Sequence, residues 1–154
     1  MRFIHLVRGR LRGGWSVSQR GSTTLELAIW GVPMLLFIGL LVVGGRLALA
    51  GNAVQSAAYA AAREATLART AATAQSAGEN AANFSLNSNG VTCIDRIVQV
   101  NTLGFNQALG TTGTVEATLT CRVNLSDSGL PGLPGSVELE RSASSPVDPY
   151  RQRP

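Results

Sequence analysis

The strongest constraint on this chain is a run of 19 uncharged and mostly apolar residues, 27–45, which lies between Glu26 and Arg46. As an α-helix the run is about 28 Å long at ~1.5 Å per residue, close to the ~30 Å hydrocarbon core of a bilayer. The alternative is a buried core helix, but a run of this length is difficult to enclose in a chain of 154 residues. We therefore predict that residues 22–50 form a transmembrane helix.

The formal net charge of +4 is concentrated before this run. Residues 1–21 hold five arginines and no acidic residue, whereas residues 22–154 hold eight arginines and nine acidic residues, a formal net charge of −1. Because positively charged flanks stay in the cytoplasm, we predict a single-pass cell membrane protein with a cytoplasmic N-terminus and an extracytoplasmic body. The position of the arginines favours a topological role over nucleic-acid binding, and no nucleic acid is expected as a partner.

The apolar run contains residues that disfavour helices in water. Pro33 removes a backbone donor within the run, and Gly44, Gly45 and Gly51 loosen its end. Transmembrane helices tolerate such residues when neighbours or local adjustments satisfy the freed backbone groups. We therefore expect a kinked or locally extended helix rather than a break.

The composition leaves little room for a catalytic site. The single histidine, His5, lies in the basic arm, so no Ser–His or Cys–His pair can form within the body. With no histidine downstream, Cys93 and Cys121 cannot complete a four-ligand zinc site, and they lack the Cys-x-x-Cys spacing of redox enzymes. We expect a non-enzymatic protein with no catalytic residues, no metal site and no cofactor.

The start of the apolar run has an unusual charge. Glu26 stands at the head of a helix that enters a membrane, where a carboxylate is costly. One interpretation is a helix start, because Thr23 and Glu26 have the spacing of a capping box and a carboxylate meets the positive end of the helix dipole. A second interpretation, compatible with the first, is a processing site.

Gly21, followed by Glu26 at the head of an apolar run, resembles the processing site of type IV prepilins and pseudopilins. In those families a prepilin peptidase cuts after the Gly, and a Glu occupies the fifth mature position. The resemblance implies that residues 1–21 are a removed leader, that Ser22 becomes the first mature residue and that Glu26 becomes the fifth. In a filament, the new amine of Ser22 in one subunit could neutralise Glu26 of a neighbour.

A longer pattern resembles the TadE-like proteins of tight-adherence (Flp-type) pilus systems. The residues that carry it are Gly21, Glu26, Pro33, Gly45-Arg46 and Ala61-Ala62-Arg63-Glu64-Ala65. The two cysteines, a Leu-Pro-Gly turn and the tail, 146–154, resemble those of the actinobacterial members. One departure is that the family often has an acidic residue shortly before the Gly-Arg pair, where this chain has Val43-Gly44.

The resemblance implies a structural role in pilus assembly. The chain would be a minor pilin or pseudopilin of a type IV pilus, with Ser22 and Glu26 making the subunit contact. The implied partners are a prepilin peptidase, the major Flp pilin, a TadF-like minor pilin, the inner-membrane pilus platform and the lipid bilayer. The protein would then lie in the membrane or in the pilus itself.

An alternative processing site lies at the end of the apolar run. Ala48-Leu49-Ala50 has the Ala-x-Ala pattern of signal peptidase, and cleavage after Ala50 would release a secreted binding domain. The long basic arm, an apolar run beyond the usual length of roughly 7–15 residues, and Arg46 just before the site argue against this alternative.

Residues 51–84 are rich in alanine, the best helix former, and are predicted to continue the membrane helix outward as a long extracytoplasmic rod. The alternative is a freestanding linker helix. Small residues at three- and four-residue spacing predict a buried stripe that includes the bulkier Tyr59 and Leu67, with Gln55, Arg63 and Arg69 facing water. The small members of the stripe are Val54, Ala58, Ala61 and Ala65. Residues 85–90 are predicted to form a loop.

The remaining segment, 85–145, is predicted to be a small β-rich domain. Residues 115–123 alternate between apolar and polar types, and residues 137–140 repeat the alternation briefly. The apolar face is formed by Val115, Ala117, Leu119, Cys121 and Val123. Residues 91–100 fit either a strand or a short helix. An antiparallel sheet packed on the Ala-rich helix gives an α+β fold with type IV pilin-like architecture, followed by an extended tail, 146–154.

Cys93 and Cys121 both lie beyond the membrane segment, where oxidation is possible. A bridge between them closes a loop with 27 intervening residues. The chain-entropy model gives such a bridge roughly 3.5 kcal/mol of stabilisation, a large contribution for a small domain. We favour this disulfide over the alternative, a pair of buried free thiols.

Overall fold

The computed structural model describes residues 22–108, 110–125 and 135–150. The chain divides into two compact units, Met1–Phe37 and Ile38–Pro154, which we describe separately. In the first unit the described residues form the beginning of helix α1 (Ser22–Leu67), and Pro33 lies inside that helix. The prediction that this proline does not break the helix is confirmed.

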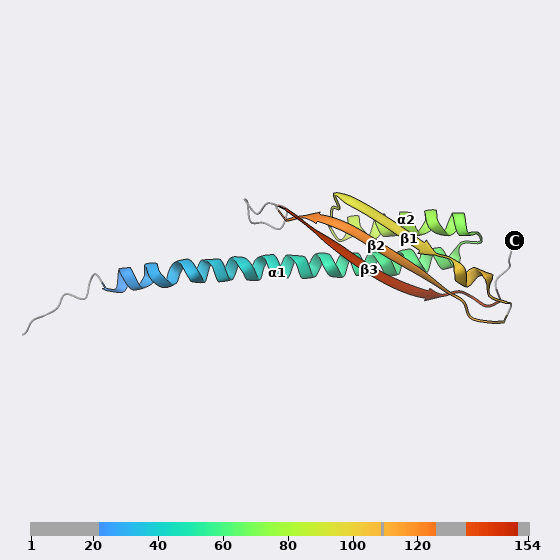
Figure 1. Ribbon diagram of the computed structural model, residues 1–154, viewed down its shortest axis with the longest axis horizontal. Coiled ribbons are helices and arrows are strands. Elements are labelled where there is room, and N and C mark those ends of the chain that lie inside the picture. Colours follow the sequence, from blue (N-terminus) through green and yellow to red (C-terminus); the bar gives the residue numbers. More distant parts are fainter. Residues whose placement is uncertain (1–21, 109, 126–134, 151–154) are drawn as a thin grey trace, which may run out of the picture. The chain divides into compact units, whose positions relative to one another are not determined.

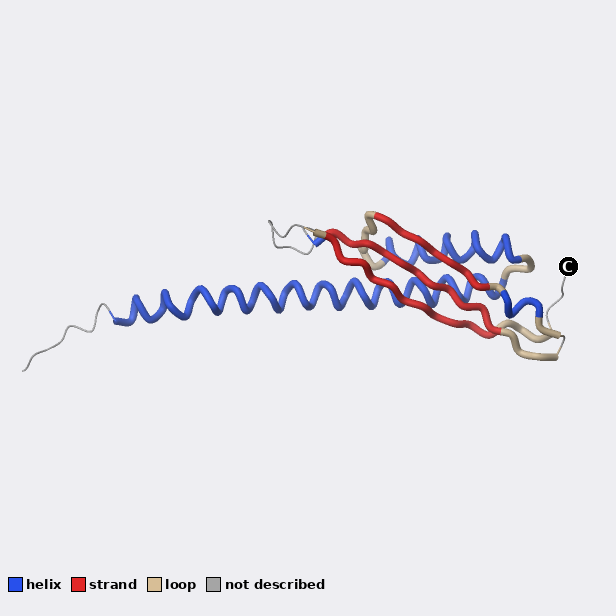
Figure 2. The backbone as a smooth tube through the Cα atoms, viewed as in Figure 1, coloured by secondary structure: helices blue, strands red, loops and turns tan. Residues whose placement is uncertain are grey.

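The second unit contains the rest of α1 and all remaining elements. These are α2 (Ala71–Ser88), β1 (Asp95–Asn101), the short 3₁₀ helix η1 (Leu103–Asn106), β2 (Thr114–Asn124) and β3 (Ser136–Pro146). The strands form an antiparallel sheet in the order β1-β2-β3, beside α2 and the C-terminal part of α1 (Figures 1 and 2). The predicted α+β fold with a small antiparallel sheet is confirmed.

The central strand, β2, follows the predicted alternation. Four of its apolar side chains are fully buried, Val115, Ala117, Leu119 and Cys121, and Val123 packs against the same core. The register places Leu119 opposite Val98 of β1 and opposite Arg141 of β3. Residues 91–100, which periodicity left undecided, contain most of β1, and the strand predicted at 137–140 extends over all of β3.

The prediction of one continuous helix over residues 51–84 is wrong. α1 ends at Leu67, and α2 starts after Thr70, whose hydroxyl accepts a hydrogen bond from the backbone N–H of Thr73 at 3.2 Å. The Thr73 hydroxyl also accepts from the backbone N–H of Thr70 at 3.1 Å, which completes a capping box. Alanine favours both helices equally, so helix propensity does not reveal the break, whereas this pair of threonines does.

The predicted loop at 85–90 is also wrong over its first part, because α2 continues to Ser88. The chain then turns at Asn89 and Gly90, where Gly90 has a φ of 67°. Two other predicted features lie outside the described residues: most of the Leu-Pro-Gly segment, within 126–134, and the end of the tail, 151–154. At the start of the tail, Val147 is buried and its N–H donates to the carbonyl of Gly113 at 2.8 Å.

The core forms where α1 meets α2 and the sheet. The predicted small-residue stripe on α1 is confirmed, since it is inaccessible to solvent at Val54, Ala57, Ala58, Ala61, Ala62 and Ala65. Tyr59 and Leu67 are instead 58% and 71% exposed, so their predicted place in the stripe is wrong. Tyr59 directly follows Ala58 and so lies about 100° round the helix from it, beyond the edge of the buried face.

A glycine lets α2 approach its two neighbours. A Cβ atom at Gly78 would lie 2.9 Å from Cγ2 of Val100 on β1 and 3.4 Å from the carbonyl oxygen of Ala61 on α1. Glycine within a helix costs roughly 0.5–1 kcal/mol relative to alanine. The close approach of three elements at Gly78 explains why this position in an Ala-rich helix is not alanine.

Glutamine side chains tie both edges of the sheet to the helices. Gln75 of α2 donates from Nε2 to the carbonyl of Val98 at 2.7 Å and accepts at Oε1 from the N–H of Val100 at 3.0 Å. Its amide therefore pairs with β1 as a neighbouring strand would. On the other edge, Gln55 of α1 donates to the carbonyl of Ser142 on β3 at 3.1 Å. Gln55, predicted to face water, is half-buried by this contact.

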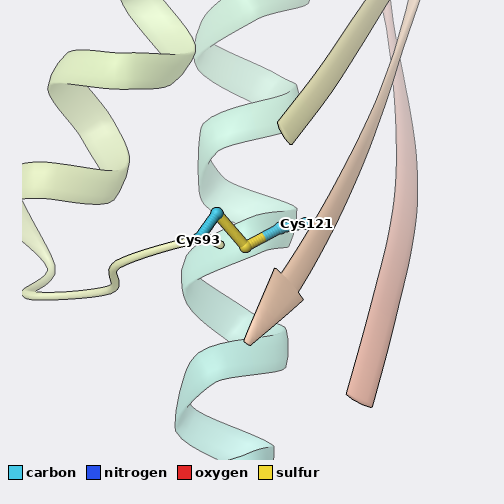
Figure 3. The surroundings of a disulfide bond; sticks show 2 residues. All are labelled: Cys93 and Cys121. Atoms are coloured by element: carbon cyan, nitrogen blue, oxygen red, sulfur yellow. A yellow bond between two sulfur atoms is a disulfide. The ribbon is translucent and has the colours of Figure 1, made fainter. Parts of the chain in front are cut away.

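The predicted disulfide between Cys93 and Cys121 is confirmed. The two Cα atoms are 5.4 Å apart, and the bond joins the segment before β1 to β2 next to α1 (Figure 3). Cys121 is fully buried in the core, whereas Cys93 is half-buried and packs against it. The bridge thus fixes the connection between α2 and β1 to the centre of the sheet.

The Gln75 contact gives a first prediction. Replacing Gln75→Met keeps the length of the side chain but leaves the carbonyl of Val98 and the N–H of Val100 without partners, which we expect to lower the free energy of unfolding by about 1–3 kcal/mol. Hydrogen exchange of the Val100 amide should become roughly tenfold faster in the full chain. Gln99→Met, on the exposed side of the same strand, serves as control. Equal exchange in both variants would contradict this role of Gln75.

The disulfide gives a second prediction. In the full chain in detergent micelles, the double variant Cys93→Ala/Cys121→Ala should lose about 3.5 kcal/mol of unfolding free energy, because the unfolded chain regains the freedom of the closed loop. Urea unfolding followed by far-UV circular dichroism measures this loss. The exposed substitution Thr92→Ala is the control, and reduction of the wild-type chain should reproduce the effect. A wild-type urea midpoint in the double variant would refute the prediction.

Candidate membrane and assembly segment

The first half of α1 presents large apolar side chains to its surroundings. Between residues 25 and 42 these side chains are 46–71% exposed. They are Leu25, Leu27, Ile29, Trp30, Val32, Met34, Leu35, Leu36, Phe37, Ile38, Leu40, Leu41 and Val42. An apolar surface this long and continuous is unfavourable in water and requires lipid or another chain around it.

Within the described part of the chain, α1 is the helix that is long and apolar enough to cross a membrane, from Thr24 onward. None of its most apolar window is buried inside the protein, which separates it from the core helix of a soluble domain. The predicted transmembrane helix is therefore supported by both length and exposure.

The predicted assembly residues lie at the start of this helix. Ser22 is the first helical residue and Glu26 follows one turn later. Glu26 is exposed, and its neighbours Leu25 and Leu27 are 67% and 71% exposed. The Glu26 carboxylate thus lies on an apolar surface. If another helix covers this surface, the carboxylate needs to pair with a cation from outside the described chain. Gly21 and the side chain of Ser22 lie outside the described residues.

Three glycines of the apolar run have no close neighbour within the described chain. A Cβ atom at Gly31, Gly44 or Gly45 would meet no atom within 4 Å. Gly78, by contrast, is required by close contacts inside the body. Small residues on a membrane helix permit close approach of another helix, so the first half of α1 has the composition of a helix-packing surface.

The surroundings of α1 change at its middle. Gly51 is buried, and a Cβ atom there would lie 3.4 Å from a guanidinium nitrogen of Arg141 on β3. From Ala53 to Ala65 the helix contributes the buried stripe of the body. One continuous helix therefore supplies both the exposed apolar segment and a central part of the core of the second unit.

The chemistry available in the body is limited. Both cysteines are joined in the disulfide, and the residues that the structure describes contain no group of three or more His, Cys, Asp or Glu placed to hold a metal ion. On the exposed face of the sheet, Arg122 pairs with Asp95 and with Glu138, at 3.4 Å each. Exposed pairs of this kind contribute little to stability.

These features define a class of chain, one with an apolar N-terminal helix of membrane-spanning length and a small α+β body. A family model described as TadE-like protein matches residues 21–63, so the predicted resemblance to the TadE-like family is confirmed over this segment. Searches of curated proteins and of solved structures found no match. The likeness to the actinobacterial members rests mainly on residues after 63 and stays a prediction.

The sequence predicted the cysteine pair, which is confirmed. Its assignment of Gly21, Ser22 and Glu26 to processing and assembly stays a prediction, and it missed Gln75. A lone glutamine in an Ala-rich helix carries no signal of its own, because its role arises only when α2 lies along the edge of β1. Gln75 lies three residues before Gly78, which is on the buried face of α2, and this spacing indicates that Gln75 lies near the same face.

Proposed function

We propose that this chain is a structural minor pilin or pseudopilin that takes part in the assembly of a tight-adherence (Flp-type) type IV pilus. One observation carries the proposal: the exposed apolar half of α1, with Ser22 and Glu26 at its head, falls inside the TadE-like match at 21–63. A prepilin peptidase would cut after Gly21 and remove the basic leader. The mature chain would begin at Ser22.

In this proposal Ser22 and Glu26 make the subunit contact. The α-amine of Ser22 in one copy or companion pilin neutralises the Glu26 carboxylate of its neighbour as the apolar helices come together. A buried carboxylate without a partner costs several kcal/mol, so the contact favours subunits in the correct axial position. The exposed setting of Glu26 among leucines supports this role, because packing against another helix would remove the carboxylate from water.

The proposed topology places the N-terminus in the cytoplasm and the body outside the cell membrane, in accord with the arginine-rich leader. The proposed partners are the prepilin peptidase, the major Flp pilin, a TadF-like minor pilin and the inner-membrane platform. The proposed role is structural and non-enzymatic.

The alternative, release of a secreted domain by signal peptidase after Ala50, is less well supported. Ala48, Leu49 and Ala50 lie inside α1, and buried residues follow immediately at Gly51 and Ala53. Cleavage there would require this part of the helix to unwind. The new N-terminus would then be formed by residues that are buried in the core.

The N-terminus tests the proposed processing. Peptide mass spectrometry of the protein from native membranes should find a first residue of Ser22, and Gly21→Leu should leave the leader attached, because a peptidase pocket for glycine excludes a larger side chain. Gly14→Leu, in the same leader, is the matched control and should be processed. A mature start at Gly51 would refute the proposal and favour the secreted domain, and an intact Met1 would leave a simple membrane anchor.

Glu26 tests the proposed assembly contact. Glu26→Leu should insert in the membrane at least as well as wild type, since it removes a charge from an apolar helix. Its amount in sheared pilus fractions should fall at least tenfold, because loss of one partner from a buried ion pair costs about 3–5 kcal/mol. Immunoblots of membrane and pilus fractions measure both quantities, with the exposed Glu116→Gln as control. Normal incorporation of Glu26→Leu would rule out the contact.

A further inference from the structure

A groove with a volume of about 470 Å³ runs between α1 and α2, within the second unit of the chain. Three alanines line it, Ala60 of α1 with Ala77 and Ala81 of α2, and Phe84 stands beside them with 76% of its side chain exposed. Phe84 follows Gln75, which binds β1, by nine residues, about 180° round the helix at ~100° per residue. The groove therefore lies on the side of α2 that faces away from β1.

This groove has the surface of a helix-binding site. Its alanines are small, so the side chains of another helix can fit between α1 and α2. Leu67 lies seven residues, about two turns, after Ala60 and so on the same face of α1, and it is 71% exposed. Burial of Phe84 and Leu67 against another chain is favourable, because it removes apolar area from water.

Two neighbouring residues of opposite charge, Arg63 and Glu64, also line the groove, and both are exposed. Neither side chain forms a hydrogen bond or an ion pair with another described residue. At ~100° per residue, Arg63 lies about 60° to one side of Ala60 and Glu64 about 40° to the other. The face of α1 around Ala60 therefore has a positive flank and a negative flank.

These flanks are complementary to those of a second copy of the same helix. When two parallel helices are related by a twofold axis along their length, each flank of one helix faces the opposite flank of the other. Arg63 of one copy then faces Glu64 of the other, and the reverse pair forms as well, at heights that differ by ~1.5 Å. An antiparallel pair would bring each flank against its like, so the charges select the parallel arrangement.

We propose that this groove binds α1 of a second copy of the chain, so that two chains form a parallel dimer through the outer face of α1 and α2. Ala60 lies next to its counterpart at the centre, with an Arg63–Glu64 ion pair on either side. Phe84 and Leu67 supply most of the buried apolar area. The parallel orientation rests on the proposed insertion of α1, because copies with the same membrane topology run in the same direction.

The dimer surface differs from the proposed filament contact. Ser22 and Glu26 lie at the head of α1, whereas the groove lies beside its C-terminal part. A companion pilin in the groove would need its own acidic and basic residues in matching positions, whereas a second copy supplies them by symmetry. The self-complementary charges are therefore the observation that selects a second copy.

Cysteine cross-linking of the full chain, expressed alone in a bacterial membrane, tests the dimer. The native cysteines are joined to each other, so Ala60→Cys supplies a thiol at the centre of the proposed contact. Mild oxidation with copper phenanthroline should link most of the chain into a species of twice the monomer mass on non-reducing gels. Glu116→Cys, exposed on β2, is the matched control and should remain a monomer.

Charge exchange in the Ala60→Cys background tests the ion pairs. Arg63→Glu places like charges on both flanks and should weaken the dimer about tenfold, equivalent to ~1.4 kcal/mol. The further change Glu64→Arg exchanges the two flanks and should restore the cross-link. Arg69→Glu, an exposed arginine beyond the end of α1, should leave cross-linking unchanged.

A monomer with Ala60→Cys, or no recovery in the charge-exchanged variant, would overturn the proposal. A cross-link to a protein of different mass in native membranes would also overturn it, in favour of a companion protein. Carbonate extraction separates the two proposals: an extracted chain contradicts insertion and with it the parallel dimer, whereas a monomer that stays in the membrane refutes the dimer alone. Expression without other pilus proteins makes the result independent of processing after Gly21.

Discussion

The fold depends on how closely other elements can approach α1. Along its second half, a stripe of alanines and one valine is inaccessible to solvent, and α2 and the sheet pack directly on it. Alanine side chains place backbones close together but each contributes little apolar area, at roughly 25 cal/mol per Å². The core of the body therefore buries little apolar area. Two other features also hold the body together: the Cys93–Cys121 bridge, and the glutamines that tie both sheet edges to the helices.

The same helix meets two different requirements along its length. Residues 25–42 carry large apolar side chains that point away from the chain, as a bilayer or a bundle of helices requires. From Gly51 onward the exposed apolar side chains give way to buried small ones. One helix therefore carries both the exposed apolar segment and the buried stripe of the body.

Parts of this arrangement were predictable because their signals are local. Strand β2 was evident from strict alternation over 115–123, and the buried stripe of α1 from its three- and four-residue spacing. The break between α1 and α2 does not follow from helix propensity, since alanine supports a helix on either side of it, and only the Thr70–Thr73 pair marks it. The exposure of Tyr59 and the bonds of Gln75 depend on which neighbours pack where, and periodicity within one element does not contain that information.

The candidate assembly residues came from a resemblance, and the match at 21–63 supports the family but not the role of each residue. The structure adds a physical reason for part of the pattern. Inside the body, Gly78 is required by atoms of the chain itself, whereas at Gly44 and Gly45 a Cβ atom would meet nothing. Glycine costs stability within a helix, so its presence at two adjacent open positions has no explanation in the described chain. The open space beside Gly44 and Gly45 leaves room for another helix to approach α1 closely.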